Sequence, residues 1–158
     1  MNINRGLGDW SMNVVRLLAC IVFFAACMHE TPTLVIHATS GDYRVTVEVA
    51  KRLADQARGL MYRQYLEKNS GMLFIFQKEE FQSFWMENTL IPLDMLFISS
   101  ERVIVDITTM QPCNVDPCPS YTSKQPAQYC LEVNAGYVCS HEIKIGDTIS
   151  SDVIRLNK

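Results

Sequence analysis

The first residue whose setting suggests chemistry is Asp94, at the end of segment 83–94 (SFWMENTLIPLD). Asn88, Thr89 and Pro92 indicate a polar turn between two very apolar stretches. Asp94 then enters an apolar stretch, where a carboxylate must be hydrogen-bonded or paired because an isolated buried charge is costly. We favour a role for Asp94 in anchoring the turn through backbone amides. The alternative is a ligand-binding or catalytic carboxylate.

A second segment of chemical interest is 111–121 (QPCNVDPCPSY), in which three prolines stiffen a loop and two cysteines stand five positions apart. This spacing differs from a Cys-x-x-Cys redox motif and favours a structural disulfide between Cys113 and Cys118. Cys130 and Cys139 predict a second bridge, although four cysteines allow three pairings. No tetrahedral set of further ligands accompanies these thiols, so we expect no metal there.

Standard catalytic signatures are absent from the sequence: it has no nucleophile elbow, no phosphate-binding Gly-rich loop and no His-Glu-x-x-His helix. The histidines are scattered, at His29, His37 and His141. An enzyme would have to use Asp94 with Asn88 or Arg63 in acid–base work, as a hydrolase would, and no spacing selects a second catalytic group. We expect no cofactor, and we leave catalysis open with the balance against it.

Metal handling is another alternative, because thioethers together with thiolates suit Cu(I). Met61, Met72 and Met86 are the methionines that this hypothesis would use. Methionine as a filler of apolar cores is the simpler interpretation.

The N-terminal segment 1–27 has the character of a targeting signal. Arg5 and Arg16 supply positive charge, and 17–26 is a run of ten apolar or small residues. That run is too short for a membrane-spanning helix, which needs about 20 residues, but it suits the apolar region of a signal peptide. The ending FAAC resembles the lipobox of bacterial lipoproteins, in which Cys27 becomes the acylated first residue.

Two other interpretations of the signal remain: an ordinary secretory signal cut after Ala25 or Ala26, and an uncleaved N-terminal anchor. All three place the domain outside the cytoplasm. We therefore expect an extracytoplasmic envelope protein held by its lipid on the periplasmic face of a membrane. The even number of cysteines in the remaining chain agrees with an oxidising compartment.

Removal of the first 27 of the 158 residues leaves 131, enough for one domain. We expect a tether at 28–32 and a single domain at 33–158. The formal net charge of −3 for the whole chain becomes about −4 when Arg5, Asp9 and Arg16 are removed. No basic stretch is present to neutralise phosphates, so we expect no nucleic-acid partner, and we expect a monomer.

The elements that position these residues are mostly strands. Residues 43–50 alternate apolar and polar side chains with a period of two, the pattern of a half-buried strand. Further strands are predicted at 34–36, 72–76, 82–87, 95–99, 102–108, 127–133 and 148–156. One helix is predicted at about 54–62, extending toward Leu66, and a helical turn at 136–142. The apolar stripe of that helix comprises Leu53, Ala57, Leu60 and Met61, and Gly59 within it predicts a close backbone contact.

These elements predict a mainly β fold of the β-rich α+β type. We expect an antiparallel sandwich or a partly closed barrel of about seven or eight short strands with one or two short helices.

Five blocks of the sequence together resemble the domain-of-unknown-function 192 family, also called uncharacterised protein family 0127. They are ARGLMYR at 57–63, GMLF at 71–74, FWMENTLIPLD at 84–94, the Pro- and Cys-rich segment 112–121, and LEVNAG at 131–136. The resemblance implies a compact β-rich fold in a mostly exported prokaryotic family and supplies no reaction. Leu53-Ala54-Asp55 replaces the usual capping residues, Glu87 replaces a common Lys, and Cys130 and Cys139 are not part of the pattern.

The favoured function is a binding or accessory module with a disulfide-clipped loop, in which one pocket receives a small polar ligand. The candidate lining residues are Arg63, Trp85, Met86, Asn88, Asp94, Tyr121 and Asn134. Hydrolase-like catalysis through Asp94 and periplasmic copper handling remain the alternatives.

Overall fold

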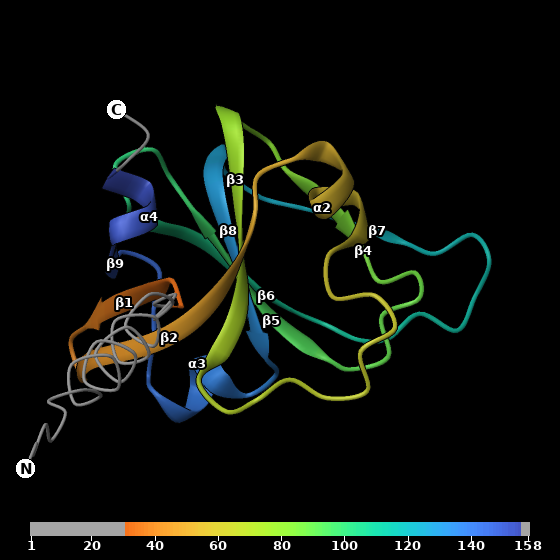
Figure 1. Ribbon diagram of the computed structural model, residues 1–158, viewed down its shortest axis with the longest axis horizontal. Coiled ribbons are helices and arrows are strands. Elements are labelled where there is room, and N and C mark those ends of the chain that lie inside the picture. The colour runs from red at the N-terminus through yellow and green to blue at the C-terminus, as the bar shows by residue number, and fades with distance from the viewer. Residues whose placement is uncertain (1–30, 156–158) are drawn as a thin grey trace, which may run out of the picture. The chain divides into compact units, whose positions relative to one another are not determined.

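Alternation of apolar and polar residues builds the first hairpin of the computed structural model, which describes residues 31–155 (Figure 1). Strands β1 (Thr33–Ala38) and β2 (Gly41–Ala50) pair antiparallel. Leu34 and Val45 lie opposite each other and are fully buried, whereas the intervening polar side chains of β2 are exposed. The period of two thus sorts side chains between a core and solvent, as the sequence predicts.

The remaining elements follow in chain order as α2 (Leu53–Arg58), β3 (Ser70–Glu80), β4 (Ser83–Trp85), β5 (Leu93–Ile98), β6 (Ile104–Met110), β7 (Ser120–Thr122), β8 (Ala127–Asn134), α3 (Tyr137–Ser140), β9 (Thr148–Ser151) and α4 (Asp152–Arg155). Seven strands form one sheet in the order β6-β5-β8-β3-β2-β1-β9, and β4 and β7 form a two-stranded sheet (Figure 1). Neighbouring strands are antiparallel except β2 and β3, which are parallel and connected through α2.

The large sheet curls until its two ends approach each other. Val103, just before β6, forms an isolated bridge with Thr148 of β9, and the Ile104 N–H donates to the Asp147 carbonyl oxygen at 2.8 Å. The result is a half-barrel, which confirms the predicted β-rich, partly closed fold.

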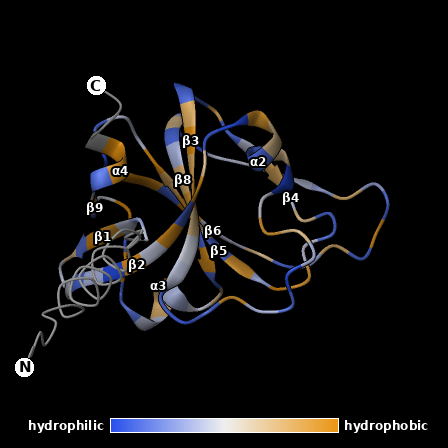
Figure 2. Cartoon of the chain, viewed as in Figure 1, coloured by the Kyte–Doolittle hydropathy of each residue, from blue (hydrophilic) through white to orange (hydrophobic). Residues whose placement is uncertain are grey.

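The central strands of this sheet carry two separate cores because both of their faces are covered. A first core contains Leu73, Leu96 and Leu131 from β3, β5 and β8. The second core, on the opposite face, contains residues adjacent to these in sequence, among them Met72, Phe74, Met95, Phe97 and Cys130. Figure 2 shows the alternation of apolar and polar residues as orange and blue bands along several strands.

The helix after β2 is shorter than predicted and does not use the predicted apolar stripe. It ends at Arg58, because Gly59 adopts φ +48°, a left-handed conformation that stops an α-helix. Leu53 is 84% exposed, and no residue of α2 is buried. Leu60 is buried in the second core, but it lies beyond the helix end.

Two smaller differences concern the C-terminal half. The predicted strand 148–156 stops at Ser151, whose Oγ accepts a hydrogen bond from the Val153 N–H at 3.3 Å as α4 begins. Strand β7 was not predicted, because its three residues follow a Pro-rich loop. The helical turn predicted near 136–142 is present as α3.

The structure contains the predicted disulfide between Cys113 and Cys118, whose Cα atoms lie 5.9 Å apart. The predicted second bridge is wrong, because Cys130 and Cys139 are both free. Cys130 is buried in the second core, whereas the helix that carries Cys139 packs through Tyr137 against the first core on the other face of the sheet. The sheet itself therefore separates the two thiols.

The predicted signal 1–27, with Cys27, and most of the predicted tether lie outside the described residues. Pro32, at the end of that tether, already lies on the sheet, because its carbonyl oxygen accepts a hydrogen bond from the Val47 N–H at 2.8 Å. Within residues 31–155, none of the helices combines the length and apolar composition needed to span a bilayer.

Candidate ligand site beneath the segment 59–69

One row of cross-strand neighbours places two acidic residues on the same face of the large sheet. Glu48 of β2 lies opposite Met72 of β3, Met72 lies opposite Glu132 of β8, and Glu132 lies opposite Met95 of β5. Adjacent strands are about 4.8 Å apart, so the Cα atoms of Glu48 and Glu132 are separated by roughly 10 Å. Glu48 is exposed at one end of this row, and Glu132 is buried within it.

Glu132 is the most unusual side chain on this face. It is 6% exposed, and among the described residues its Oε2 is the one buried side-chain oxygen or nitrogen without a hydrogen-bond partner. Burial raises the pKa of its carboxyl group from 4.5 to about 8. The carboxyl group is therefore mostly protonated and neutral at pH 7. Strong perturbation of a buried acid is a common mark of functional sites.

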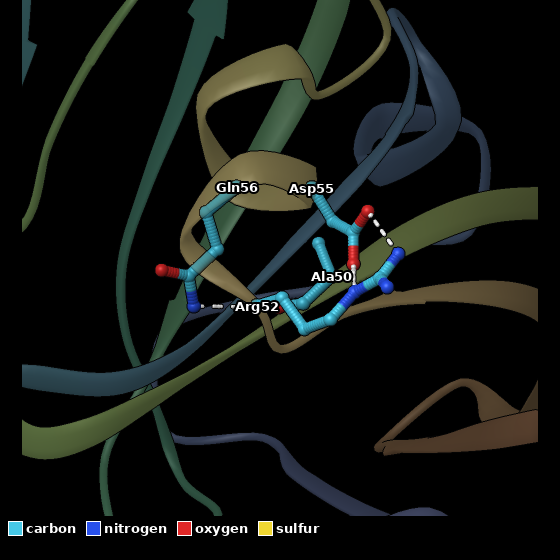
Figure 3. Close-up of polar contacts among 4 residues, drawn as sticks. All are labelled: Ala50, Arg52, Asp55 and Gln56. Atoms are coloured by element: carbon cyan, nitrogen blue, oxygen red, sulfur yellow. Dashed lines mark hydrogen bonds and ion pairs between the residues drawn. The ribbon is translucent and has the colours of Figure 1, made fainter.

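Gly59 covers the Glu132 carboxyl group at the end of α2. A Cβ atom at residue 59 would lie 4.0 Å from Glu132 Oε2 and 3.5 Å from the ring of Phe74. The helix is fixed above the sheet by Gln56, whose side-chain amide donates to the carbonyl oxygens of Ile75 at 2.8 Å and Ala50 at 3.4 Å. Figure 3 shows the Gln56–Ala50 contact beside the Arg52–Asp55 ion pair at the start of the helix.

After Gly59 the chain continues as an irregular covering segment, residues 59–69, before it enters β3. The Tyr62 N–H donates to the Asn88 carbonyl oxygen at 2.8 Å. The Asn134 side chain, two positions after Glu132 on the same strand, donates to the carbonyl oxygens of Leu66 at 2.9 Å and Glu67 at 3.3 Å. These bonds are the points at which β8 and the turn after β4 hold the covering segment in place.

Arg63 forms the third attachment of the covering segment. Its guanidinium group donates two hydrogen bonds to the Glu48 carboxylate, at 2.5 and 2.6 Å. This bidentate pairing with Glu48 raises the pKa of Arg63. The pair is part-exposed, so it contributes little to stability but places both charges at one edge of the segment.

Between the covering segment and the sheet lies an open pocket of about 520 Å³. Its lining residues include Glu48, Arg63, Tyr65, Leu66, Glu67 and Ser70. The volume falls within the range of small-molecule sites in proteins, about 300–1,000 Å³. The pocket therefore combines the Arg63–Glu48 ion pair, the Glu67 carboxylate and the Tyr65 ring. It lies on the same face of the sheet as the buried Glu132.

The residues predicted to line a single pocket are distributed over four places. Arg63 lines the pocket and Asn134 holds its covering segment, while Asn88 contacts that segment through its carbonyl oxygen. Met86 is buried in the second core. Trp85, 51% exposed, lies in the β4–β7 sheet one residue from the pair formed by Phe84 and Tyr121.

Asp94 lies on the opposite face of the sheet, with the first core. It is 2% exposed, its Oδ1 accepts from the Thr109 hydroxyl at 2.7 Å, and its Oδ2 accepts from the Val138 N–H at 3.0 Å. Both oxygens are thus used to hold β6 and the start of α3. This geometry supports the anchoring interpretation of Asp94 and separates it from Arg63.

Glu132 is a functional candidate that the sequence patterns described above do not single out. A signal was available, because Glu132 is the one charged residue in the apolar run YCLEV at 129–133. A central strand buried on both faces reads as a nearly continuous apolar run, so a single acid within it is informative.

No three His, Cys, Asp or Glu side chains come together as a potential metal site anywhere in residues 31–155. Met72 and Met86 are buried in the second core, as apolar fillers would be. Cys130 is buried beside them, and burial, together with the nearby Glu132, raises the pKa of its thiol well above the usual value.

The model of the DUF192 family, described as uncharacterized ACR, matches residues 35–151. This chain belongs to the DUF192 family. Two of its curated relatives are archaeal UPF0127 proteins. The one from Pyrococcus abyssi is 28% identical over 65% of this chain and 83% of its own length. The one from Thermococcus gammatolerans is 28% identical over 76% of both chains.

Crystal structures of two bacterial proteins resemble this DUF192 chain closely in fold. A protein of unknown function from Novosphingobium aromaticivorans is 32% identical, with a TM-score of 0.67 over 75% of this chain and 83% of that one. A proposed transcription regulator from Sinorhizobium meliloti is 34% identical, with a TM-score of 0.71 over 76% of this chain and 92% of that one.

Proposed function

We propose that this DUF192 protein is an extracytoplasmic, lipid-anchored binding module that takes a small polar ligand in the pocket beneath the covering segment. The observation that carries the proposal is the buried Oε2 atom of Glu132, which has no hydrogen-bond partner and lies below the covering segment. The same segment lines a polar pocket of the size of a small ligand. A buried polar group without a partner costs stability, so its retention favours a role in binding.

Four of the five sequence blocks that resemble the family meet around this site. Block 57–63 provides Gly59 and Arg63, block 71–74 provides Met72, block 84–94 provides the Asn88 carbonyl oxygen, and block 131–136 provides Glu132. These blocks are far apart in sequence, and their meeting at one face favours this face as the functional one.

The anchoring part of the proposal rests on the signal-like segment 1–27. Thr31 and Pro32 lie beside Glu48 and Ser70, which also line the candidate pocket. A lipid on Cys27 would tether the domain to a membrane, because Cys27 stands four positions before Thr31 in the sequence.

We do not extend the transcription-regulator description of the Sinorhizobium meliloti protein to this chain. The formal net charge of this chain is −3, and the residues that line its pocket include more acidic than basic side chains. Binding to DNA depends on neutralising phosphates with Lys and Arg, which this composition opposes.

Chemical-shift perturbation of the ¹⁵N-labelled domain with a panel of amines, carboxylates and sugars tests binding. We expect shifts of the amides of residues 62–70, and weaker binding in Arg63→Gln. The matched control is Arg44→Gln, an exposed arginine on the same strand as Glu48. The proposed binding site would be refuted if no compound shifted the amides of this region, or if both variants weakened binding equally.

Metabolic labelling with palmitate tests the anchor separately. Label on the parent protein and none on Cys27→Ala is the expected result. An unlabelled parent would reduce the proposal to simple secretion or an uncleaved anchor without affecting the pocket.

A further inference from the structure

We propose that the ligand is a small organic cation bearing a primary amine, and that Glu132 receives its ammonium group as a carboxylate after giving up a proton. This inference rests on the proposed binding function and specifies its ligand class and the residue that recognises it. Three observations carry it. They are the charges of the side chains at the pocket, the lack of a hydrogen-bond partner for Glu132 Oε2, and the contacts that attach the covering segment to the sheet.

The charges at the pocket favour a cation. Glu48 and Glu67 line the pocket and Glu132 lies on the same face, whereas Arg63 is the basic side chain among the lining residues. The bidentate contact pairs the Arg63 and Glu48 charges with each other, so the charged lining residues Glu48, Arg63 and Glu67 leave a net charge of −1 on Glu67. The exposed ring of Tyr65 is also able to interact with a cation through its face.

Within residues 31–155, no hydrogen-bond donor reaches Glu132 Oε2. Its cross-strand neighbours are Met72 and Met95, and Gly59 lies over its carboxyl group. Along its own strand, Cys130 is a buried thiol and Asn134 uses its amide N–H groups on the covering segment. The nearest base named above, Arg63, is bound to Glu48 two strands away.

On the adjacent row of the same face lies Asp106, whose oxygens accept from the backbone N–H groups of Ile107 and Lys124. The Lys124 Nζ atom also forms an ion pair with Asp106 Oδ1 at 3.5 Å. A ligand ammonium group has three N–H donors and a positive charge. It would give the Glu132 oxygen the hydrogen-bond donor and the opposite charge that it lacks. A ligand anion would instead bring its charge close to Glu67, and Arg63 is already paired with Glu48.

Access to Glu132 requires displacement of part of the covering segment, in which Leu60 is buried in the second core and Leu66 packs against that core. Gly59 contributes no side chain above the carboxyl group, and Tyr62 and Asn69 have positive φ angles of 63° and 57°. Two backbone bonds attach the segment, from the Tyr62 N–H to the Asn88 carbonyl oxygen and from the Thr46 N–H to the Asn69 carbonyl oxygen at 2.9 Å. The other polar attachments come from the side chains of Asn134 and Arg63. An outward shift of the backbone between Gly59 and Asn69 would connect the pocket to the Glu132 carboxyl group.

The proton balance of binding is simple. The neutral Glu132 carboxylic acid and the ligand ammonium ion become a carboxylate–ammonium pair, and one proton passes to solvent. A carboxyl group with a pKa of about 8 is mostly protonated at pH 7, so binding should release most of one proton per ligand.

Isothermal titration calorimetry of the whole domain at pH 7 in phosphate, PIPES and HEPES buffers, none of which contains a primary amine, tests this inference. The probes are n-butylamine, 1,4-diaminobutane, sodium butyrate and glucose. We expect the amines to bind with release of most of one proton, and butyrate and glucose not to bind. Glu132→Gln should weaken amine binding at least tenfold and abolish proton release, whereas the control Glu101→Gln, an exposed acid in the β5–β6 turn, should change neither.

The ¹³C shift of the Glu132 side-chain carboxyl group in the wild-type domain gives a second readout that does not depend on a folded variant. It should move to its ionised value at pH 7 when n-butylamine is added. Binding of butyrate or glucose without amine binding, or amine binding without proton release, would overturn this inference and leave the pocket standing. Failure of every probe to bind would count against both the inference and the proposed function.

Discussion

Gly59 lies directly over the carboxyl group of Glu132, so that a Cβ atom at residue 59 would approach Oε2 to 4.0 Å. The glycine ends α2 and the glutamate lies in the middle of β8, 73 positions later in the sequence. The contact joins the start of the covering segment to the isolated acid of the sheet. Stability, titration and binding at this site should therefore respond together to changes at either residue.

Gly59→Ala should lower the free energy of unfolding by about 2 kcal/mol, because φ +48° with ψ −135° is a conformation that only glycine adopts readily. The added methyl group should also shield Glu132 further and raise its pKa. Urea unfolding and carboxyl ¹³C titration measure the two effects. Gly146→Ala, also at a positive φ but with open space around it, should lose stability without altering the titration of Glu132.

The stability of the domain should fall as pH rises between about 4.5 and 8, because Glu132 has a raised pKa in the folded state. The folded protein binds more protons than the unfolded chain in this window, so the contribution is fully present below pH 4.5 and lost above pH 8. Its upper limit is about 5 kcal/mol.

Urea unfolding of Glu132→Gln and wild type at pH 5 to 9 measures this contribution of Glu132. The variant should lack this part of the pH dependence, whereas Glu101→Gln should retain it. A wild-type profile that rises over the same window and is unaffected by Glu132→Gln would contradict the assignment.

Asn134→Ala should release the covering segment from β8, because it removes both side-chain bonds to Leu66 and Glu67. We expect a loss of about 1–2 kcal/mol in unfolding free energy. Hydrogen exchange of the amides of residues 62–69 should accelerate more than that of β5 or β6. Uniform acceleration across the sheet would indicate a general loss of stability without local opening.

Asp94→Ala should destabilise the domain by about 3 kcal/mol, because it leaves the Thr109 hydroxyl and the Val138 N–H without their buried acceptor. Ligand binding by the folded fraction should be unchanged, since Asp94 lies with the first core on the other face. The exposed Asp42→Ala serves as the control for loss of a carboxylate. Loss of binding with normal stability would restore the ligand-binding interpretation of Asp94.

Peptide mapping without reduction should recover Cys113 linked to Cys118, with Cys130 and Cys139 unlinked. A thiol reagent should modify the exposed Cys139 in the native protein and reach the buried Cys130 only after unfolding. Recovery of a Cys130–Cys139 peptide would require the two thiols to reach the same face of the sheet.

Local sequence patterns determined much of this protein. The period of two predicted β2, apolar runs predicted β3, β5 and β8, and the Cys113–Cys118 spacing predicted the clipped loop. These features depend on neighbours within a few residues, so they are visible before folding. The length of α2 was misjudged because its apolar stripe was assumed to face a core, whereas the left-handed turn at Gly59 ends the helix first.

The tertiary structure alone decided which residues share a face. Period-two alternation separates the two sides of a strand, but β3, β5 and β8 are buried on both sides, so alternation does not say which side carries which core. The register between distant strands placed Glu48, Met72 and Glu132 in one row on one face of the sheet, and Asp94 on the opposite face. That register is set by pairings between strands far apart in the chain, which no short segment of sequence encodes.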